Sequence, residues 1–314
     1  MPFSPIALLA RLQRQFQLLP PDLAASLLML SAMVVFTGTG VLVRMAAESM
    51  PIFQILFVRQ IVTIALMSPL FWRHRSQILH PQGLRLHIFR GFAAVGAMTC
   101  GNAAVIYIPF ADVTAIQMSE VLFITALAAI FLGEKVGWRR WTATCVGFAG
   151  VGVMLQPFSG PIDTFAVLAL VGSVFGALSV ATLRFGSRLD TTETVIFFQS
   201  IVVLVCMAPL AWWFWVPVTA RGLLVVLAMG FMLAAGTLLF TNAFRSGNAS
   251  AIAPLQYLRL LMMAGVGYWL YGETPSVATI VGSTLIVGAA IYTLHRNAVR
   301  QSPIPAAPRP DAPG

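Results

Sequence analysis

Two charged residues interrupt long apolar stretches of the sequence. Glu120 lies in the segment MSEVLF at 118–123, and Arg259 lies in the segment YLRLLM at 257–262. A charged side chain at the centre of an apolar spanning segment costs about 2.5–3.5 kcal/mol, so it faces the protein interior or a wet cavity. A carboxylate can hold an amine, and a guanidinium can hold a carboxylate or carbonyl oxygen. The two charges predict a binding site for a small molecule with both donor and acceptor groups, such as a zwitterion.

Amide and phenol side chains accompany these charges. An amide lies three residues before each charge, a spacing that puts it on the same helix face. These amides are Gln117 and Gln256, and Tyr257 follows the second. Asn102 and Asn242 are further amides within apolar segments, for which a tether between helices is favoured over contact with a ligand. The candidate substrate-binding residues are Glu120, Arg259, Gln117, Gln256, Tyr257, Asn102 and Asn242.

The elements that hold these residues are predicted to be membrane-spanning helices of an all-α polytopic membrane protein. Hydrophobic residues make up 59% of the 314 residues and charged residues only 9%, whereas an ordinary soluble domain is about 25% charged. A spanning helix needs about 20 apolar residues, and uniform apolar runs favour helices over barrel strands. Ten spans are predicted, at 22–43, 52–72, 88–107, 113–132, 139–156, 164–184, 193–215, 221–241, 249–270 and 277–294.

The net charge of +9 follows membrane topology and does not indicate a nucleic-acid partner. With the N-terminus inside, most Lys and Arg residues fall on that side, Arg90 among them, which is the positive-inside pattern. We therefore expect both termini in the cytoplasm and a multi-pass protein of the inner (cytoplasmic) membrane, in contact with the lipid bilayer. Arg44 and Arg184 lie at span ends, where solvent is expected to hold them. Arg59 is expected to be structural, reaching out to the interface or pairing with Glu48.

The second half of the sequence repeats the first. At an offset of 140 residues, MSPLFW at 67–72 matches MAPLAW at 207–212. After a single-residue gap the offset is 139, and Glu120 then matches Arg259. Each copy holds about five spans, so the second copy enters the membrane from the opposite side, and such inverted five-helix repeats are typical of secondary transporters. The predicted organisation is a cytoplasmic amphipathic arm at 1–21, a first repeat at 22–156, a second repeat at 164–294 and a disordered cytoplasmic tail at 295–314.

Two motifs close the fourth and ninth predicted spans. They read FLGEKVGWRRW at 131–141 and LYGETPS at 270–276, and their Glu134 and Glu273 are expected to brace turns. In this order the motifs resemble the EamA family of ten-helix carriers in the drug/metabolite transporter superfamily. The second half is similar to bacterial members that handle metabolites such as S-adenosylmethionine or riboflavin. The resemblance implies a carrier of a small organic molecule, driven by protons or another gradient, or working by exchange.

The two central charges allow three interpretations in such a carrier. They contact substrate directly, they pair with each other in one conformation and separate in another as a gate, or they form a static structural pair. A buried carboxylate without a partner can take up a proton near neutral pH, whereas a neighbouring cation keeps it ionised. Proton coupling through Glu120 therefore requires its pair with Arg259 to separate during the transport cycle.

Two other classes are alternatives to a secondary transporter that works by alternating access. An integral-membrane enzyme would need a cluster of catalytic groups within the spans, and the sequence shows none. A membrane scaffold or sensor would have little need of two charges at the midplane. No nucleotide-binding, cofactor or metal motif is recognisable, so we expect no cofactor, no metal site and no direct drive by ATP. The sequence makes no prediction of oligomeric state.

Overall fold

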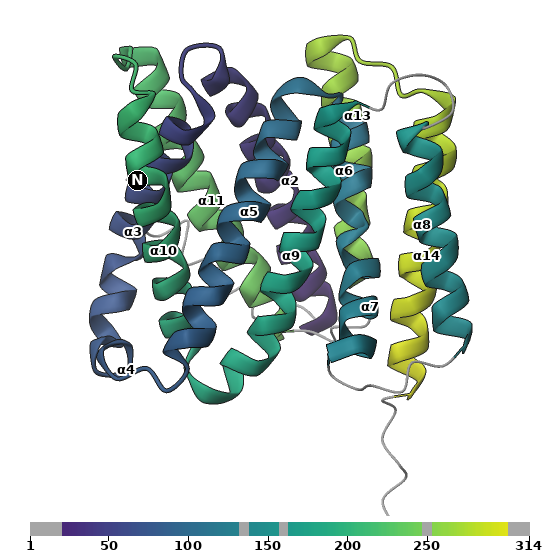
Figure 1. The fold of residues 1–314 in the computed structure, drawn as a ribbon, viewed down its shortest axis with the longest axis horizontal. Helices are drawn as coiled ribbons and strands as arrows, with labels where there is room; N and C mark the ends of the chain where they lie inside the picture. The colour runs from purple at the N-terminus through teal and green to yellow at the C-terminus, as the bar shows by residue number, and fades with distance from the viewer. Residues whose placement is uncertain (1–20, 132–137, 157–162, 247–252, 301–314) are drawn as a thin grey trace, which may run out of the picture.

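The computed structural model describes residues 21–131, 138–156, 163–246 and 253–300. Every regular element in this part of the chain is a helix, and it contains no strand (Figure 1). The elements are α2 (Pro21–Ala47), α3 (Ile52–Arg73), α4 (Arg75–Leu79), α5 (Leu84–Tyr107), α6 (Phe110–Met118), α7 (Glu120–Phe131), α8 (Trp138–Leu155), α9 (Thr164–Leu189), α10 (Thr192–Trp213), α11 (Ala220–Ser246), η1 (Ala253–Tyr257), α13 (Leu258–Tyr271) and α14 (Val277–Arg300).

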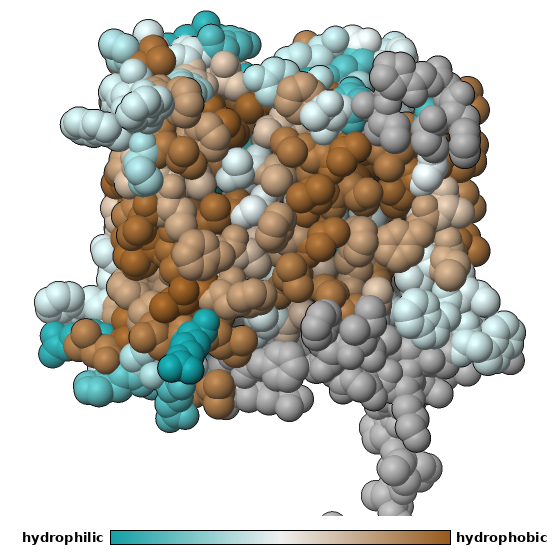
Figure 2. Space-filling model, in the orientation of Figure 1, coloured by the Kyte–Doolittle hydropathy of each residue, from teal (hydrophilic) through white to brown (hydrophobic). Residues whose placement is uncertain are grey.

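Seven of the described helical segments are long and apolar enough to cross a membrane. They are Leu23–Ala47, Ile52–Arg73, Leu84–Tyr107, Phe110–Leu127, Thr164–Thr182, Glu193–Trp213 and Ala220–Phe240; two shorter apolar helices are Trp141–Leu155 and Val277–Tyr292. Figure 2 shows a broad apolar band on the visible face, with hydrophilic residues gathered toward the two ends of the helices. Trp212, Trp213 and Trp269 are 82–85% exposed, which suits an aromatic belt at a lipid interface. The protein is therefore an all-helical, multi-pass membrane protein.

Helices of the first half pack against helices of the second half. The main pairs are α2 with α11, α5 with α9, α3 with α10 and α8 with α14. If each helix is replaced by its match in the other half, the pair α2–α11 becomes the pair α9–α5. The pairs α3–α10 and α8–α14 each consist of two matched helices, so they stay the same. The packing thus follows the sequence repeat, while the number of ten spans and the inversion of the repeats stay predictions.

The fourth predicted span, at 113–132, lies along the apolar segment Phe110–Leu127, but it is divided at Ser119 into α6 and α7, where one uninterrupted helix was expected. α6 ends one residue before Ser119, and α7 begins one residue after it at Glu120. The backbone tightens there, because the Ser119 N–H donates to the Ile116 carbonyl at 3.0 Å and the Leu122 N–H donates to the Ser119 carbonyl at 2.9 Å. These three-residue bonds have 3₁₀ geometry, which often marks a functional hinge inside a helix.

The ninth predicted span, at 249–270, is divided in the same way. The 3₁₀ helix η1 leads directly into α13, which begins at Leu258. At the offset of 139 residues Ser119 matches Leu258, so the two interruptions occupy corresponding places in the two halves. Arg259 follows the second interruption as Glu120 follows the first.

The C-terminal end of α13 is fixed by a glycine. Gly272 has a φ of 66°, a left-handed conformation that glycine adopts without steric penalty. The reversal lets the Glu273 N–H donate to the Gly267 carbonyl at 3.1 Å. It also carries the Glu273 side chain to the start of α6, where its backbone partner lies.

The last helix extends beyond its predicted end. α14 continues to Arg300, past the predicted start of the disordered tail at 295. Most of the predicted cytoplasmic arm, at 1–20, and the rest of the tail, at 301–314, lie outside the described residues.

Candidate functional site

Glu120 begins α7, where the helix restarts after the break at Ser119. A carboxylate at this end of a helix is stabilised by the helix dipole. The carboxylate packs closely on α9 at Gly176, where an added Cβ would lie 2.6 Å from Oε2. Within the described part of the chain, the Glu120 side chain has no hydrogen bond and no ion pair.

Arg259 lies in the first turn of α13, at the position that matches Glu120. The two charges interact electrostatically, but no N–O distance of 4.0 Å or less joins these two described residues. The Nε atom of Arg259 is buried without a hydrogen-bond partner, and the dipole of its own helix disfavours a cation there. The structure brings the two predicted charges together without a closed ion pair. Whether the two charges contact substrate, act as a gate or form a static structural pair stays a prediction.

The predicted amides of the first half bond to α5. Gln117 Nε2 donates to the Gly101 carbonyl of α5 at 3.4 Å, so this amide joins α6 to α5. Asn102 Nδ2 donates to the Met98 carbonyl at 2.6 Å, which belongs to its own helix. This hydrogen bond therefore does not provide the helix-to-helix tether expected of Asn102.

The remaining candidates of the second half differ in position. Gln256 and Tyr257 are half-buried in η1, three and two residues before Arg259. Asn242 is exposed on α11, whereas its repeat match Asn102 is half-buried on α5. The structure thus gathers an amide and a phenol at the second interruption, and the role of each as a substrate ligand stays a prediction.

One face of α9 brings three other helices together. Ser173 Oγ donates to a carbonyl of α6 at 3.2 Å, and Gly176 accommodates the carboxylate of Glu120 from α7. One turn further along, Ser179 Oγ accepts a hydrogen bond from Arg90 Nε of α5 at 3.4 Å. Arg90 is half-buried on α5 and lies against α9, which corrects its assignment to the loop between the second and third spans.

Three arginines combine a buried, unbonded side-chain nitrogen with the lack of a carboxylate partner among the described residues. Each has a buried nitrogen without a hydrogen bond, namely Nε of Arg59, Nη1 of Arg90 and Nε of Arg259. Arg59 is only 3% exposed, and its Nη2 lies 3.7 Å from the sulfur of Met98. Arg59 neither reaches the interface nor forms an ion pair with Glu48, which corrects both predictions for it.

Arg44 is held by protein groups and not by solvent, contrary to the prediction. It forms an ion pair with Glu273, and it donates from Nε to the Val105 carbonyl at 2.9 Å and from Nη2 to the Ile108 carbonyl at 2.6 Å. Its guanidinium also lies 3.9 Å from the centre of the Phe110 ring. Glu273 accepts the backbone N–H of Phe110 at 2.8 Å, so it does brace a turn, and the network joins α2, α5, α6 and α13.

A second bonded network, missed by the sequence analysis, lies where α9 meets α10. The carboxylate of Asp190 accepts hydrogen bonds from Gln82 N–H at 3.0 Å and Gly83 N–H at 2.8 Å, and lies 2.8 Å from His87 Nε2. Burial raises the pKa of the Asp190 carboxyl, but these three hydrogen bonds outweigh burial and hold the pKa below its ordinary value. His87 and Asp190 are 103 residues apart in sequence and share no motif, so no sequence signal joins them.

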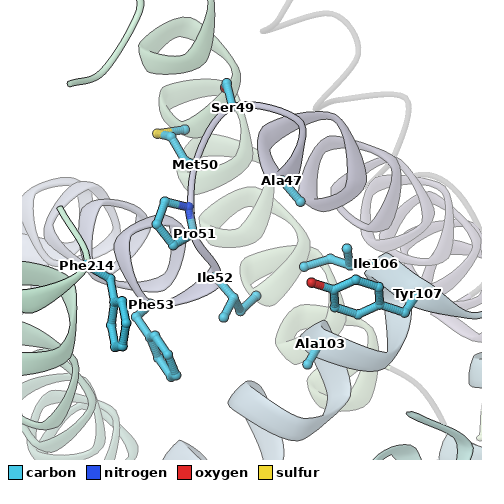
Figure 3. A pocket seen from close by; sticks show the side chains of 10 residues that line it. All are labelled: Ala47, Ser49, Met50, Pro51, Ile52, Phe53, Ala103, Ile106, Tyr107 and Phe214. Carbon is cyan, nitrogen blue, oxygen red and sulfur yellow. The ribbon is translucent and has the colours of Figure 1, made fainter. Parts of the chain in front are cut away.

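A hollow of about 360 Å³ lies where α2 turns into α3, beside the end of α5 (Figure 3). Its lining residues are Ala47, Ser49, Met50, Pro51, Ile52, Phe53, Ala103, Ile106, Tyr107 and Phe214. Figure 3 shows Phe53 beside Phe214, and the centres of their rings are 5.9 Å apart. None of the candidate binding residues lines this hollow, so it is separate from the predicted site.

The apolar helices are those of a multi-pass membrane protein. Comparison with known families agrees, because residues 23–156 and 164–294 each match the EamA-like transporter family, and the chain belongs to this family. This confirms the resemblance seen in the motifs.

Several relatives are similar over most of the chain. The pseudopaline exporter CntI of Pseudomonas aeruginosa strain UCBPP-PA14 is 31% identical over 275 residues, which cover 86% of this chain and 96% of the relative. The S-adenosylmethionine uptake transporter of Rickettsia felis is 27% identical, covering 77% of this chain and 83% of its own. The riboflavin transporter of Rhizobium johnstonii is 28% identical, covering 81% and 80%. These relatives are named as transporters and not as enzymes.

A solved structure supports the fold. A crystal structure of a protein of 18% sequence identity superposes with a TM-score of 0.58 and covers 88% of this chain and 99% of its own. At this identity the likeness concerns the fold alone.

Proposed function

We propose that this protein is a secondary transporter that moves a small polar organic metabolite across the cytoplasmic membrane by alternating access. The observation that carries the proposal is the position of Glu120 and Arg259. They come from matched places in the two halves, each lies in the first turn of a helix that follows an interruption, and no ion pair joins these two described residues. Interrupted helices at corresponding places of two repeats are where many secondary transporters bind substrate.

The proposed architecture has ten spans arranged as two inverted repeats. The exchange of the pair α2–α11 for the pair α9–α5 supports a two-fold relation between the halves. An odd number of spans in each repeat makes that relation an inversion. The distribution of Lys and Arg then puts both termini in the cytoplasm.

The proposed substrate contacts follow from the two charges. Glu120 receives an amine or another donor of the substrate, and Arg259 receives a carboxylate or carbonyl oxygen through its planar set of donors. The unbonded Nε of Arg259 supports a site that is completed by a ligand. The residues proposed to orient the substrate by hydrogen bonds are Gln117, Gln256, Tyr257, Asn102 and Asn242.

The proposed energy source is a proton gradient or exchange. Glu120 and Arg259 lie on separate half-helices, α7 and α13, so a rocking motion of the two halves changes their separation. When Arg259 moves away, the buried carboxylate takes up a proton, and when Arg259 returns, the proton is released. Such a cycle serves uptake and export equally, and the relatives include both.

Transport in membrane vesicles tests this proposal. Vesicles that contain the protein are incubated with a metabolite extract, and accumulated compounds are identified by mass spectrometry against vesicles without the protein. We expect Glu120→Gln to abolish the protein-dependent accumulation. Glu48→Gln is the matched control, because Glu48 is an exposed carboxylate outside the helices. Accumulation that is undiminished in Glu120→Gln would refute the proposed site.

The same preparation separates a transporter from an enzyme. Purified protein in detergent has no second compartment, so a transporter leaves the composition of the extract unchanged. Chemical conversion of a metabolite by the detergent-solubilised protein would instead support the integral-membrane enzyme.

A further inference from the structure

The interior of the described helices carries more unpaired positive charge than negative charge. Arg59, Arg90 and Arg259 each have a buried nitrogen without a hydrogen bond. Three of the described carboxylates are bonded to other groups: Glu273 to Arg44, Asp190 to His87, and Asp112 to Thr279. Glu120 interacts electrostatically with Arg259. A buried charge without a partner is costly, so the imbalance calls for an anionic ligand.

Arg90 lies close to the proposed substrate site along α9. Its Nε donates to Ser179, and Ser179 is one turn from Gly176, where the Glu120 carboxylate packs. Three residues of α-helix correspond to about 4.5 Å along the axis. Arg90 therefore contacts α9 about one helical turn from the seat of Glu120, on the side toward the end of the molecule where His87 pairs with Asp190.

Arg59 is in a different setting. Its guanidinium contacts the sulfur of Met98 and is almost fully enclosed. The apolar cluster around Leu56 and Ala94 includes Met98 and fills the space between α3, α5 and α10. Among the described residues no hydrogen bond or ion pair joins Arg59 to α9, so it is left out of the site.

We infer that Arg90 is a second anion-binding residue of the transport path, and that the substrate is an amino acid-like anion with at least two carboxylates. This inference rests on the proposed function. The amine of the substrate binds Glu120, one carboxylate binds Arg259 on α13, and the second carboxylate binds Arg90 on α5. The two guanidinium groups and one carboxylate of the protein leave one positive charge, which the substrate's extra carboxylate neutralises. A guanidinium suits this role because its parallel donors match the two oxygens of a carboxylate.

A graded set of probes tests the inference on the purified full-length protein. Alanine carries one carboxylate, aspartate carries two and N-carboxymethyl-aspartate carries three, and each carries one amine. Affinities are obtained from the shift of the melting temperature with probe concentration. We expect the wild-type protein to bind the probes with two and three carboxylates at least about tenfold more tightly than alanine.

Variants of Arg90 separate this inference from the proposed function. Arg90→Gln is expected to remove the advantage of the additional carboxylate and to leave alanine binding within about twofold of the wild type. Arg90→Lys keeps the charge without the paired donors and is expected to be intermediate. Arg85→Gln is the matched control, since Arg85 is exposed on the same helix, and it is expected to bind every probe as the wild type does.

The outcomes are distinct. If the wild type shows no preference for additional carboxylates, or if Arg90→Gln keeps that preference, the inference is wrong. If Arg90→Gln behaves as expected but Glu120→Gln binds every probe like the wild type, the anion site stands and the proposed role of Glu120 fails. Should Arg90→Gln not fold, Arg90→Lys carries the test, and an unchanged probe preference in that variant overturns the inference.

Discussion

Two Arg–Glu sites join the halves of this protein, and they differ in how completely their charges are bonded. Arg44 and Glu273 form an ion pair, and Arg44 also donates to two backbone carbonyls. Glu120 and Arg259 form no ion pair, and Arg259 keeps a buried nitrogen without a partner. We call the first site saturated, because its charged groups already have their bonding partners and leave none free for a ligand. We call the second site unsaturated, because it keeps a charged group that can still bind a ligand. The number of bonding partners thus distinguishes the structural pair, Arg44 and Glu273, from the proposed binding pair, Glu120 and Arg259.

Helix ends explain why the first site is saturated. The carbonyls of Val105 and Ile108 lie at the C-terminal end of α5, where carbonyls lack partners within the helix, and Arg44 bonds to both. Glu273 accepts the N–H of Phe110 at the start of α6, where donors lack partners. At the second site each charge is itself at a helix start, which suits Glu120 and disfavours Arg259. An anion that arrives near Arg259 therefore removes an unfavourable arrangement.

The largest expected effect on stability is at the saturated site. Arg44→Met leaves the Glu273 carboxylate largely buried without its cation and frees two carbonyls, so we expect a loss of about 3–5 kcal/mol. Thermal melting of the detergent-solubilised protein measures it. The double variant Arg44→Met/Glu273→Met should recover part of the loss, because no charge is left unpaired. If Arg44→Met melted at the same temperature as the wild type, the Arg44–Glu273 pair would not be a stabilising structural pair.

The unsaturated site should respond with the opposite sign. Arg259→Met removes a buried cation that has no closed partner, so we expect the melting temperature to stay equal or to rise. Transport should fall at least about tenfold, because the substrate loses a charge-assisted bond. Vesicle transport and melting are measured on the same preparation. A loss of stability as large as that of Arg44→Met would show that Arg259 is structural.

The network around Asp190 is a second saturated site, because its carboxylate already has three bonding partners, and it can be tested in the same way. Asp190→Asn replaces a carboxylate that holds two backbone N–H groups and His87, so we expect a loss of about 2 kcal/mol near neutral pH. The pKa of folded Asp190 lies below its ordinary value of 3.8. Its stabilising contribution is therefore present above about pH 4 and is lost as the pH falls through the folded pKa. The difference in melting temperature between wild type and Asp190→Asn should accordingly shrink steadily as the pH falls below about 4. A difference that stays constant from neutral pH down into this acidic range would assign the stabilisation to groups other than this carboxylate.

The sequence predicted the helices better than it predicted the bonds between them. Hydropathy located the helices because the bilayer sets their length and composition. The interruptions before Glu120 and Arg259 were missed, since neither Ser119 nor Leu258 is a helix breaker and the tightening depends on packing. Arg44 was misplaced because its partner Glu273 is 229 residues away, and only the fold brings the two together.

The repeat carried more information about the candidate site than any motif did. Matching the halves singled out Glu120 and Arg259, and the two charges lie close enough to influence each other electrostatically without forming an ion pair. Arg90 was missed because it lies near the start of its span, where a cation is expected to reach solvent. Its contact with Ser179 becomes visible only when α5 packs on α9.

The smallest expected effect comes from the glycine that seats the Glu120 carboxylate. A Cβ in Gly176→Ala would lie 2.6 Å from Oε2, and the flexible carboxylate can move aside, so we expect little change in melting temperature and a loss of substrate affinity of about fivefold. Gly230→Ala is the matched control, because its Cβ would meet the branched side chain of Val62 at 2.6 Å. That contact lies in apolar packing away from the site, so Gly230→Ala should lower stability by about 1–3 kcal/mol and leave substrate affinity unchanged. If both variants changed substrate affinity equally, crowding the Glu120 carboxylate would have no greater effect on binding than crowding an apolar contact elsewhere. Glu120 would then show no special role in binding, and the contrast between the two Arg–Glu sites would fail.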